Sequence, residues 1–516
     1  MKGRQSRFQK SSALYVAIVA TWLGLFGCAA YGLWAASSTL RESSLIGALL
    51  LIIVLAFVGY FWLNGVKDLM YLVWYYLVMP RRAGGVHNLP SRRRDVSTPD
   101  VVLVYCTRND FNATALERSR RQTYGRCRTV ILDDSDQVPF LAEIDDWASR
   151  HEVEVVRRSG REGFKAGNLN NFLRLGSYDF AVILDSDEVI PPEFTTRALD
   201  YFAADDHVGI VQANHVASGM TTTFQKAFAL GVDSHWPVYQ SVKNEYGFMS
   251  LLGHGAMLSR ECYDAAGGFP HVVAEDISFS LAAREAGYVT VFAPDIVCEE
   301  EYPPDYLAFR KRHAKWTEGN MEFIRRSTLP ISRSRRLRWF EKLDVVLFTY
   351  ALPLTAVFSL FIVINIGVLP LMGQRIVFPL WTLAPTLAFL IAPMINDVVF
   401  HWRTHSKRRL AIYSGGAMLL YGGMYWTSLR ASLKATFGGS IFTVTPRYAT
   451  TLSFRDALRS VRGEAVFACA LVVVSAALTR SVWSVILLVL PALGAVFLAV
   501  LHQPRQKVFT ERVAPE

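Results

Sequence analysis

Residues 180–187 read FAVILDSD, five apolar residues followed by two aspartates that flank a serine. A short apolar run without a charge predicts a strand that is buried on both faces, as in the parallel sheets of α/β proteins. Residues 101–107 (VVLVYCT) and 129–134 (TVILDD) have the same pattern. The three stretches together predict an α/β domain in which buried parallel strands deliver polar residues to one edge.

Ligands of open α/β sheets bind outside the carboxyl ends of the strands, so Thr107, Asp133 and Asp134 are expected to line one crevice. Each acid taken alone can equally cap the following helix, and that alternative stays open. Asp185 and Asp187 are more specific. In an extended Asp-x-Asp both carboxylates point to the same side, where they can share one Mg²⁺ or Mn²⁺ with phosphate oxygens.

Long apolar runs lie at both ends of this chain of 516 residues, of which 52% are hydrophobic. Residues 13–36 and 45–63 are each long enough, as helices, to cross a hydrocarbon core. The first run is longer than the usual apolar region of a signal peptide, has no clear cleavage site and is followed at once by another span, so we expect it to be retained. Further apolar runs cover residues 345–369, 377–400, 411–429, 465–478 and 482–501.

Basic residues set the expected orientation of these spans. By the positive-inside rule, the basic clusters before residue 13 and after residue 80 place both ends of the first hairpin, and the middle of the chain, in the cytoplasm. Clusters within residues 333–338 and 403–409 bracket a second hairpin in the same way. The net charge of +10 is therefore expected to face anionic lipid, in preference to nucleic acid.

The cysteine pattern also favours an intracellular domain. The six cysteines are scattered and include no CxxC pair. This pattern predicts free thiols in a reducing compartment.

A family resemblance rests on four motifs: residues 107–110 (TRND), Asp133-Asp134, residues 165–170 (KAGNLN) and residues 185–187 (DSD). Their set resembles the inverting family 2 glycosyltransferases, especially the membrane polysaccharide synthases typified by bacterial cellulose, chitin and hyaluronan synthases. The resemblance implies a GT-A-like domain that binds a nucleotide-sugar donor. Lys165 would offer a charge to the donor phosphates, and Gly167 and Asn168 would let the backbone approach the nucleotide.

The resemblance continues into a candidate acceptor loop and a candidate base. Residues 252–260, followed by Gly267-Gly268-Phe269, are similar to the acceptor-side loop of the family, with His254 where a small residue is usual. Ala274-Glu275-Asp276 is similar to the Thr-Glu-Asp motif, which assigns Asp276 as the general base. An acceptor hydroxyl needs such a base because it is too weak an acid to attack unaided. The two acids can equally form the first turn of a helix, which is compatible with that role.

Two further motifs extend the resemblance. Residues 312–316 (RHAKW) stand where the family has Gln-x-x-Arg-Trp, so Trp316 would present an aromatic face to a sugar and Lys315 would replace the arginine at the diphosphate. Residues 442–447 (FTVTPR) resemble the gating loop of the cellulose-synthase group, which adds Thr445 and Arg447 to the donor site. That loop must be cytoplasmic, so residues 411–437 cannot cross the membrane and are expected to form an interfacial helix.

The predicted organisation has three parts: a transmembrane hairpin (1–80), a cytoplasmic GT-A-like domain with interfacial helices (81–342), and a C-terminal membrane region (343–516) with the interfacial helix 411–437 and the gating segment 438–462. The expected location is a bacterial-type inner or plasma membrane. The expected activity is processive, inverting, metal-dependent elongation of a β-linked polysaccharide from a UDP-hexose such as UDP-glucose, with translocation of the product across the membrane.

Two other functions stay open: a non-processive transferase that adds one sugar to a lipid carrier, and an export channel or binding scaffold without chemistry. The expected partners are the donor, the growing glycan and the bilayer, with an accessory export protein left open and no nucleic acid. Residues 332–342 are basic and amphipathic and are expected to lie flat on the membrane. Asn365, Asn396 and Asp397 fall at or near membrane depth, where they would face a cavity or one another. For Asn396 and Asp397, capping of a helix end is the alternative.

Overall fold

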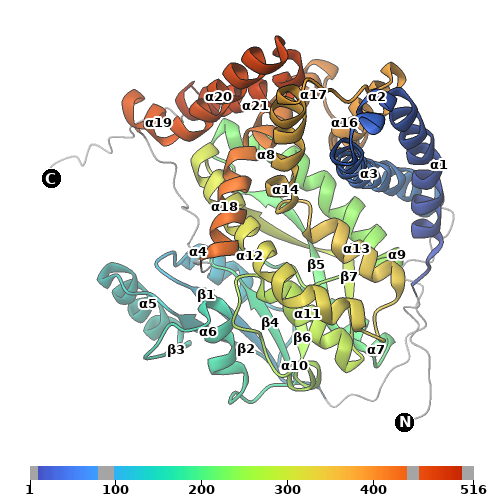
Figure 1. Ribbon diagram of the computed structural model, residues 1–516. Helices are drawn as coiled ribbons and strands as arrows, with labels where there is room; N and C mark the ends of the chain where they lie inside the picture. The colour runs from blue at the N-terminus through green and yellow to red at the C-terminus, as the bar shows by residue number, and fades with distance from the viewer. Residues whose placement is uncertain (1–9, 80–97, 439–451, 502–516) are drawn as a thin grey trace.

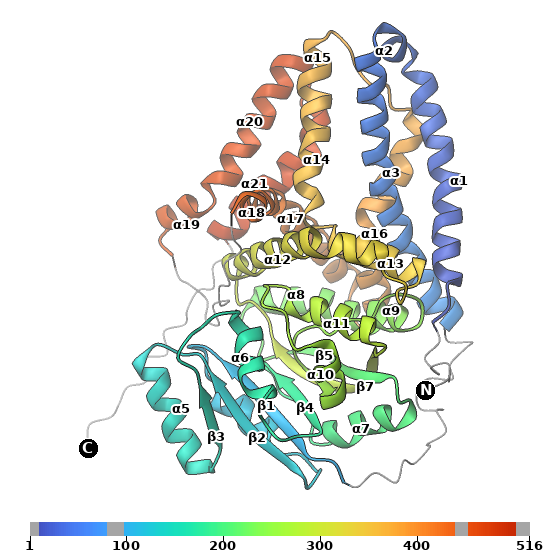
Figure 2. The same ribbon diagram turned by 60° about the horizontal axis from the view of Figure 1, so that its bottom comes forward.

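The computed structural model describes residues 10–79, 98–438 and 452–501. Figure 2 separates two regions, a mixed α/β domain around one sheet and a group of long helices that rise from one side of it. In Figure 1, the first helices (blue) and the last helices (red) lie on the same side of the sheet, although they are far apart in sequence. The α/β domain lies between them in sequence, as an insertion.

One seven-stranded sheet forms the centre of the α/β domain, in the order β3-β2-β1-β4-β6-β5-β7. The first four strands in this order are mutually parallel, β6 runs antiparallel to both of its neighbours, and β7 pairs parallel to β5. The predicted α/β class and the three predicted parallel strands are confirmed. The strands are β1 (Val101–Thr107), β2 (Cys127–Asp133), β3 (Glu154–Arg157), β4 (Phe180–Leu184), β5 (Val208–Ser218), β6 (Ala256–Ser259) and β7 (Val289–Glu301).

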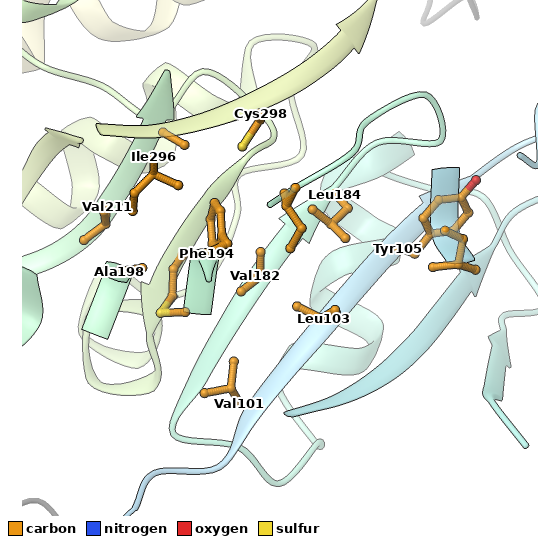
Figure 3. Close-up of a cluster of buried hydrophobic side chains, with 14 of the residues drawn as sticks. Val101, Leu103, Tyr105, Val182, Leu184, Phe194, Ala198, Val211, Ile296 and Cys298 are labelled. Carbon is orange, nitrogen blue, oxygen red and sulfur yellow. The ribbon is translucent and has the colours of Figure 1, made fainter. Parts of the chain in front are cut away.

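The sheet is buried on both faces, which explains the uninterrupted apolar runs. Alternate residues of β1 divide between two separate clusters: Leu103 and Tyr105 belong to one, Val102 and Val104 to the other. Figure 3 shows the first cluster, in which Leu103 and Val182 lie near Phe194 of a covering helix. Because helices pack on both faces, the strands are held in place. The polar residues that follow the parallel strands therefore lie together at one edge of the sheet.

Helices cover both faces of the sheet (Figure 1). They are α4 (Ala113–Ser119), α5 (Val138–His151), α6 (Phe164–Leu173), α7 (Phe194–Ala204), α8 (Thr223–His235), α9 (Ser241–Tyr246), α10 (Arg260–Ala266) and α11 (Glu275–Ala286). The π-helical turn Trp236–Gln240 joins α8 to α9.

Among the described residues, four helical segments are long and apolar enough to cross a membrane: Ala13–Ala36, Leu45–Val78, Leu380–His401 and Arg462–Thr479. Two shorter apolar segments, Ala356–Leu371 and Trp483–Ala499, accompany them. The second segment has 34 residues and is therefore about 51 Å long, against a hydrocarbon core of about 30 Å. Its C-terminal turns consequently have length to spare for contact with the α/β domain.

The N-terminal segments consist of α1 (Ala13–Ala36), α2 (Ser38–Ser43) and α3 (Leu45–Val73), which continues into the π-helical turn Trp74–Val78. The C-terminal helices are α14 (Leu354–Val363), α15 (Leu369–Leu371), α16 (Leu383–His401), α19 (Phe454–Ser460), α20 (Arg462–Thr479) and α21 (Ile486–Leu501). Short π-helical and 3-10 segments, Ile364–Val368, Leu380–Thr382 and Trp483–Val485, adjoin them. All six cysteines are free, as predicted.

Two expected helices are each divided in two. The apolar run 345–369 contains the end of α13 (Trp339–Thr349) and all of α14. The two helices are separated before Pro353, because proline disfavours a helical residue before it. The expected interfacial helix 411–437 is α17 (Lys407–Gly423) and α18 (Tyr425–Phe437). Gly422 and Gly423 precede the break and pack closely on α21, where a Cβ at Gly422 would lie 2.6 Å from Pro491.

Helices α12 (Tyr306–Arg333) and α13 lie crosswise between the sheet and the rising helices (Figure 2). The basic stretch 332–342 is not one helix, because α12 ends at Arg333 and α13 begins at Trp339. Helix α12 reaches from the candidate site to the C-terminal helices, so it joins the two regions of the molecule.

Candidate functional site

The ends of β1 and β4 meet through a shared aspartate. Thr107 Oγ1 donates to Asp110 Oδ1 (2.8 Å), and Ser186 Oγ donates to Asp110 Oδ2 (2.9 Å). Burial raises the pKa of Asp110. Thr107 is itself buried and pairs in register with Asp133 of β2. The predicted convergence of polar strand ends is therefore present, and Asp110 holds two of them together.

Asp133 and Asp134 are buried, and both form ion pairs with arginines. Arg157 Nε donates to Asp133 (2.7 Å), and Arg158 binds Asp134 through Nε (2.8 Å) and Nη2 (2.6 Å). Sequence reasoning missed both arginines, because Arg157 ends the edge strand β3, Arg158 follows it, and both pair with acids at the end of the neighbouring strand β2. The carboxylates lie where a nucleotide would be expected, and their contact with a donor stays a prediction.

The KAGNLN string forms the start of α6 and serves mainly to fix that helix. Gly167 and Asn168 are buried, so the expectation that they leave the backbone open to a nucleotide is wrong. A Cβ at Gly167 would lie 1.9 Å from the carbonyl oxygen of Glu162, which requires glycine there. Asn168 Nδ2 donates to Leu132 O (3.1 Å) and Asn170 Nδ2 to Phe269 O (2.7 Å). The string thereby ties α6 to β2 and to the loop before α11.

Lys165 projects from the first turn of α6 toward the aspartate motif. Its Nζ forms a short ion pair with Asp185 and donates to Gly253 O (2.8 Å). Burial opposes the lysine charge, but the Asp185 carboxylate raises the pKa of Lys165 above its usual value. Lys165 therefore joins α6, the end of β4 and the loop around Gly253, and it keeps a positive charge where phosphates are expected.

The Asp185-Ser186-Asp187 motif is a turn, and the expectation of an extended Asp-x-Asp is wrong. Asp185 directly follows β4, and Ser186 is held by Asp110, which bends the chain at this point. Burial, Glu300 and Asp185 together raise the pKa of Asp187 to about 8. Such crowding of carboxylates at one point is what a divalent cation with oxygen ligands would relieve.

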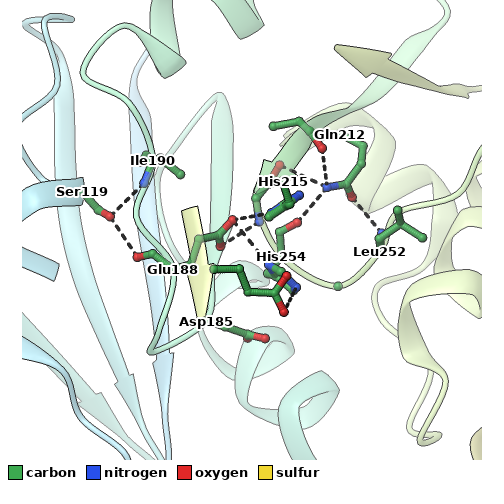
Figure 4. Close-up of polar contacts among 12 residues, drawn as sticks. Ser119, Asp185, Glu188, Ile190, Gln212, His215, Leu252 and His254 are labelled. Carbon is green, nitrogen blue, oxygen red and sulfur yellow. Dashed lines mark hydrogen bonds and ion pairs between the residues drawn. The ribbon is translucent and has the colours of Figure 1, made fainter. Parts of the chain in front are cut away.

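Next to this turn lies a buried cluster that sequence reasoning missed, except for His254 (Figure 4). Glu188 is fully buried; its Oε1 lies 2.8 Å from His215 Nε2 and 3.4 Å from His254 Nδ1. His254 Nε2 is 3.8 Å from Glu300. Burial opposes both charges, but the histidines lower the pKa of Glu188 to about 2, while Glu188 and Glu300 raise the pKa of His254 to about 10. His254 is thus a buried cation between two acids, and its acceptor role stays a prediction.

Glu188, His215 and Cys298 are close enough to hold a metal ion, since their ligand atoms lie within 4.8 Å of one another. A thiol and an imidazole suit Zn²⁺ better than Mg²⁺. However, Glu188 already accepts a hydrogen bond from Gly255 N (2.9 Å) in addition to its histidine contacts. Gly255 has φ 59°, and a Cβ there would lie 2.3 Å from both Glu188 and His215. These contacts explain the cluster as the support of the loop that carries Gly253.

The candidate base lies at the N-terminus of α11, opposite this loop. Asp276 is half-buried, its Oδ1 accepts from Ile277 N (2.7 Å), and its Oδ2 lies 3.7 Å from where a Cβ on Gly253 would be. Burial raises the pKa of Asp276. Burial and Asp276 raise the pKa of Glu275 to about 7. A carboxylate with a raised pKa at a helix N-terminus is suited to accept a proton near neutral pH.

Helix α12 places the motif of residues 312–316 beside the aspartate turn and the candidate base. Trp316 is 42% exposed, and the Arg312 guanidinium lies 4.7 Å from its ring centre. Arg312 Nη2 pairs with Glu300 Oε1 (3.0 Å), which gives a physical reason for arginine in place of the family's glutamine. Burial lowers the pKa of Lys315, whose charge lies near Glu275 and Asp185. Glu300 was missed because it lies within a strand and no local motif marks it.

Thr445 and Arg447 lie outside the described residues, whereas the chain on both sides of them is attached to α12. Arg325 Nη1 donates to Ala435 O (2.8 Å) near the end of α18. Arg310 Nη1 donates to Ser460 O (2.7 Å) and pairs with Glu464 (3.0 Å). The helix that carries Lys315 and Trp316 therefore also anchors both flanks of segment 439–451.

Two of the three polar residues expected near membrane depth, Asp397 and Asn365, have hydrogen-bond partners among the described residues. Asp397 accepts from Ser234 Oγ of α8 (2.5 Å) and from the Tyr413 hydroxyl of α17 (2.7 Å), so it links α16 to two other helices and does not cap its own. Asn365 Nδ2 donates to Phe361 O in the preceding turn (2.8 Å). Asn396 is buried, and neither polar atom of its side chain has a partner among the described residues.

Comparisons with known proteins show which proteins this chain resembles. Residues 180–395 match the family model described as "Glycosyl transferase family group 2". Glucomannan 4-beta-mannosyltransferase 2 of Arabidopsis thaliana is 25% identical over 228 residues, which are 42% of each chain. Probable glucomannan 4-beta-mannosyltransferase 7 of Oryza sativa subsp. japonica is 25% identical over 294 residues, 52% of this chain and 49% of that protein. The alignments thus span less than half the length of these relatives.

Among solved structures, the mannosyltransferase PcManGT from Pyrobaculum calidifontis, in complex with GDP-Man and Mn²⁺, is 20% identical with a TM-score of 0.43, covering 75% of this chain and 97% of that one. S. aureus TarS 1-349 is 14% identical with a TM-score of 0.36, covering 65% and 90%. The family match begins at β4 and includes the aspartate turn, the candidate base and the α12 motif. Over residues 180–395 the chain is therefore similar to family 2 glycosyltransferases, and it resembles cellulose-synthase-like mannosyltransferases over about half of its length.

Proposed function

We propose that the protein is a processive membrane glycosyltransferase that elongates a β-linked polysaccharide from a nucleotide-diphosphate hexose. The observation that carries the proposal is the convergence at Gly253: Lys165 bonds to its carbonyl, Lys165 also pairs with Asp185, and Asp276 faces it from the other side. A phosphate-binding cation, a metal-binding acid and a base thus surround one point.

In the proposed reaction, the donor diphosphate lies beside Lys165 and Lys315. The Asp276 carboxylate takes the proton of the acceptor hydroxyl, whose oxygen attacks the anomeric carbon from the face opposite the diphosphate. A new glycosidic bond forms, the bond from the anomeric carbon to the diphosphate oxygen breaks with its electron pair, and the configuration inverts. The nucleoside diphosphate leaves, and its charge is partly balanced by the two lysines.

Asp185 and Asp187 would hold a Mg²⁺ or Mn²⁺ ion, and the crowding of carboxylates around Asp187 fits a cation with oxygen ligands. The ion supplies neutralisation of the charge that develops on the departing diphosphate. Thr107, Asp133 and Asp134 are proposed to contact the nucleotide, with Thr445 and Arg447 completing the donor site.

Acceptor binding is assigned to Trp316 and His254. Trp316 offers an exposed aromatic surface on a crosswise helix next to the membrane-type helices, which is where a polymer would leave the site. The proposed location is an inner or plasma membrane with the α/β domain in the cytoplasm, and translocation of the glycan between the helices is part of the proposal.

A donor screen with product sizing tests this function. Purified protein in lipid nanodiscs is incubated with radiolabelled UDP-glucose, other UDP-hexoses and GDP-mannose, the last because the curated relatives are named mannosyltransferases. We expect polymer from one donor. A single-sugar adduct of a lipid carrier would favour the non-processive alternative, and product formation unchanged by Asp276→Asn and Asp185→Asn would contradict the assigned site.

A further inference from the structure

Two buried carboxylates of α13 lie at the junction between the α/β domain and the N-terminal helices. Glu341 and Asp344 are each 1% exposed and stand one helical turn apart. Figure 2 shows α13 between α11 and α9 on one side and α1 and α3 on the other. Burying two acids is costly unless each is fully paired, so their partners indicate what the junction holds in place.

Glu341 holds the far end of the base-bearing helix. Its two oxygens lie 3.3 Å from Nε and Nη2 of Arg284, which is in the last turn of α11. Glu341 also accepts from Arg338 N (2.9 Å), which fixes its position at the start of α13. Asp276 lies in the first turn of α11, so a rotation or shift of this 12-residue helix would move the candidate base.

Asp344 holds the chain that leads into the Gly253 loop. It accepts from Phe248 N (2.7 Å) and pairs with Lys243 (3.2 Å). Gly247 must lack a Cβ, which would lie 2.4 Å from Asp344 Oδ2. Three residues after Phe248, Leu251 N donates to Ser280 Oγ of α11 (2.8 Å).

Ser280 of α11 links Leu251 to the backbone of Asp276. Its hydroxyl donates to the carbonyl oxygen of Asp276 (2.8 Å) while accepting from Leu251. The two α13 carboxylates are therefore connected to the candidate base in two ways. Glu341 is connected through helix α11, and Asp344 is connected through the chain segment from Phe248 to Leu251.

Asp344 is bonded directly to α3, whereas Glu341 is connected to the segment before α1 through Arg338. The Tyr71 hydroxyl of α3 donates to Asp344 Oδ1 (3.0 Å) and lies 2.7 Å from the Tyr15 hydroxyl of α1. Lys10, just before α1, donates to Gly247 O (2.7 Å), and its own carbonyl accepts from Arg338 (2.9 Å). Tyr71 lies near the C-terminal end of the 34-residue segment Leu45–Val78, beyond the roughly 20 residues that suffice to span a hydrocarbon core, so it can connect a membrane span to the junction.

We propose that Glu341 and Asp344 form a clamp that positions α11, and through it the Asp276 carboxylate, relative to α1 and α3. The position that α1 and α3 take in a bilayer would thereby change the kcat of the enzyme. The inference rests on the proposed function of Asp276. Glu341 and Asp344 are positioning residues: neither is assigned any contact with donor or acceptor.

The first test separates turnover from binding. In Glu341→Gln the amide keeps an acceptor for Arg338 N but loses the charge that holds Arg284. We expect kcat per folded site to fall about tenfold with the donor KM within about twofold, because a small displacement of a base costs rate more than affinity. The double variant with Arg284→Gln should fall no further, since the two residues act as a pair. Asp146→Asn, at an exposed ion pair of α5, is the control and should leave kcat unchanged.

The second test concerns the membrane link. Wild type and Tyr71→Phe are compared in nanodiscs of short-chain and long-chain phosphatidylcholine. We expect the wild-type kcat to differ between the two bilayers and the difference to shrink in Tyr71→Phe. A kcat of Glu341→Gln within about twofold of wild type, or the same bilayer dependence in Tyr71→Phe as in wild type, would overturn the clamp.

Hydrogen exchange gives a readout that needs no turnover. Glu341→Gln should increase exchange across α11 while exchange in α5 stays unchanged, and equal exchange in α11 would also count against the clamp. If the wild type transfers sugar and the Glu341→Gln and Tyr71→Phe variants have the same kcat and the same exchange, the clamp proposal is wrong and the proposed function stands. If wild type transfers no sugar from any donor, the proposed function fails, whatever exchange shows.

Discussion

Replacement of Asp276 by asparagine tests the chemistry most directly, because the structure allows an isosteric change. Asp276 Oδ1 accepts from Ile277 N (2.7 Å), and the amide oxygen of asparagine can keep that bond. Fold and donor binding should therefore persist while the proton acceptor is lost. General base catalysis contributes about 10² to 10⁴ in rate, which is about 3 to 5 kcal/mol of transition-state stabilisation.

The expected result is a fall in kcat of at least about a hundredfold with donor affinity nearly unchanged. The assay combines radiolabelled transfer under saturating donor with equilibrium binding of the nucleoside diphosphate. Glu275→Gln is the matched control, since it removes the neighbouring charge without removing the assigned base. An Asp276→Asn variant that loses donor affinity in proportion to rate would refute the assignment and place Asp276 in the metal or nucleotide site.

The pH dependence of the wild type follows from the same assignment. Burial raises the pKa of Asp276, and the base must be deprotonated to act, so kcat/KM should fall as the pH drops through that raised pKa. A carboxylate with an ordinary pKa would keep its activity down to about pH 4.

Three further predictions address the rest of the site. Removal of divalent cations by a chelator should abolish transfer, with recovery on addition of Mn²⁺ or Mg²⁺, and undiminished transfer in chelator would exclude a metal role for Asp185 and Asp187. Trp316→Ala should shorten the polymer while slow donor hydrolysis persists, as measured by product length; an unchanged length distribution would remove Trp316 from the acceptor site. Arg312→Gln should lower stability by about 2 to 3 kcal/mol in thermal denaturation, because Glu300 would stay buried beside Asp187 without its partner, whereas Arg312→Lys should lose less.

Much of the sheet edge was predictable, because strands buried on both faces have a distinctive sequence pattern. Runs of apolar residues located β1, β2 and β4, and the acids after them marked the edge. The partners of those acids were not predictable. Arg158 meets Asp134 because β3 lies beside β2 in the sheet. His215 of β5 meets Glu188, which follows β4, although β6 lies between these two strands in the sheet.

Predictions from short sequence motifs also failed where a residue has a packing or hydrogen-bonding role that depends on distant parts of the chain. Gly167 suggested an open backbone, yet it gives room to the carbonyl oxygen of Glu162. The aspartate motif looked extended, yet the hydrogen bond from Ser186 to Asp110 turns it. The run 411–437 was predicted as one helix. The break after Gly422 and Gly423 was not predictable, because these two glycines are required by their close packing on α21, which is distant in sequence.

The attachment of α12 to both flanks of segment 439–451 has a practical consequence for engineering. Arg325 bonds Ala435 and Arg310 bonds Ser460, so the two described stretches that flank this segment are attached to a single helix. A chimera that exchanges residues 439–451 for those of a relative would inherit both attachments from the host protein, together with Lys315 and Trp316. Segment exchange within this scaffold therefore offers a way to compare donor preferences among family members while the acceptor side stays constant.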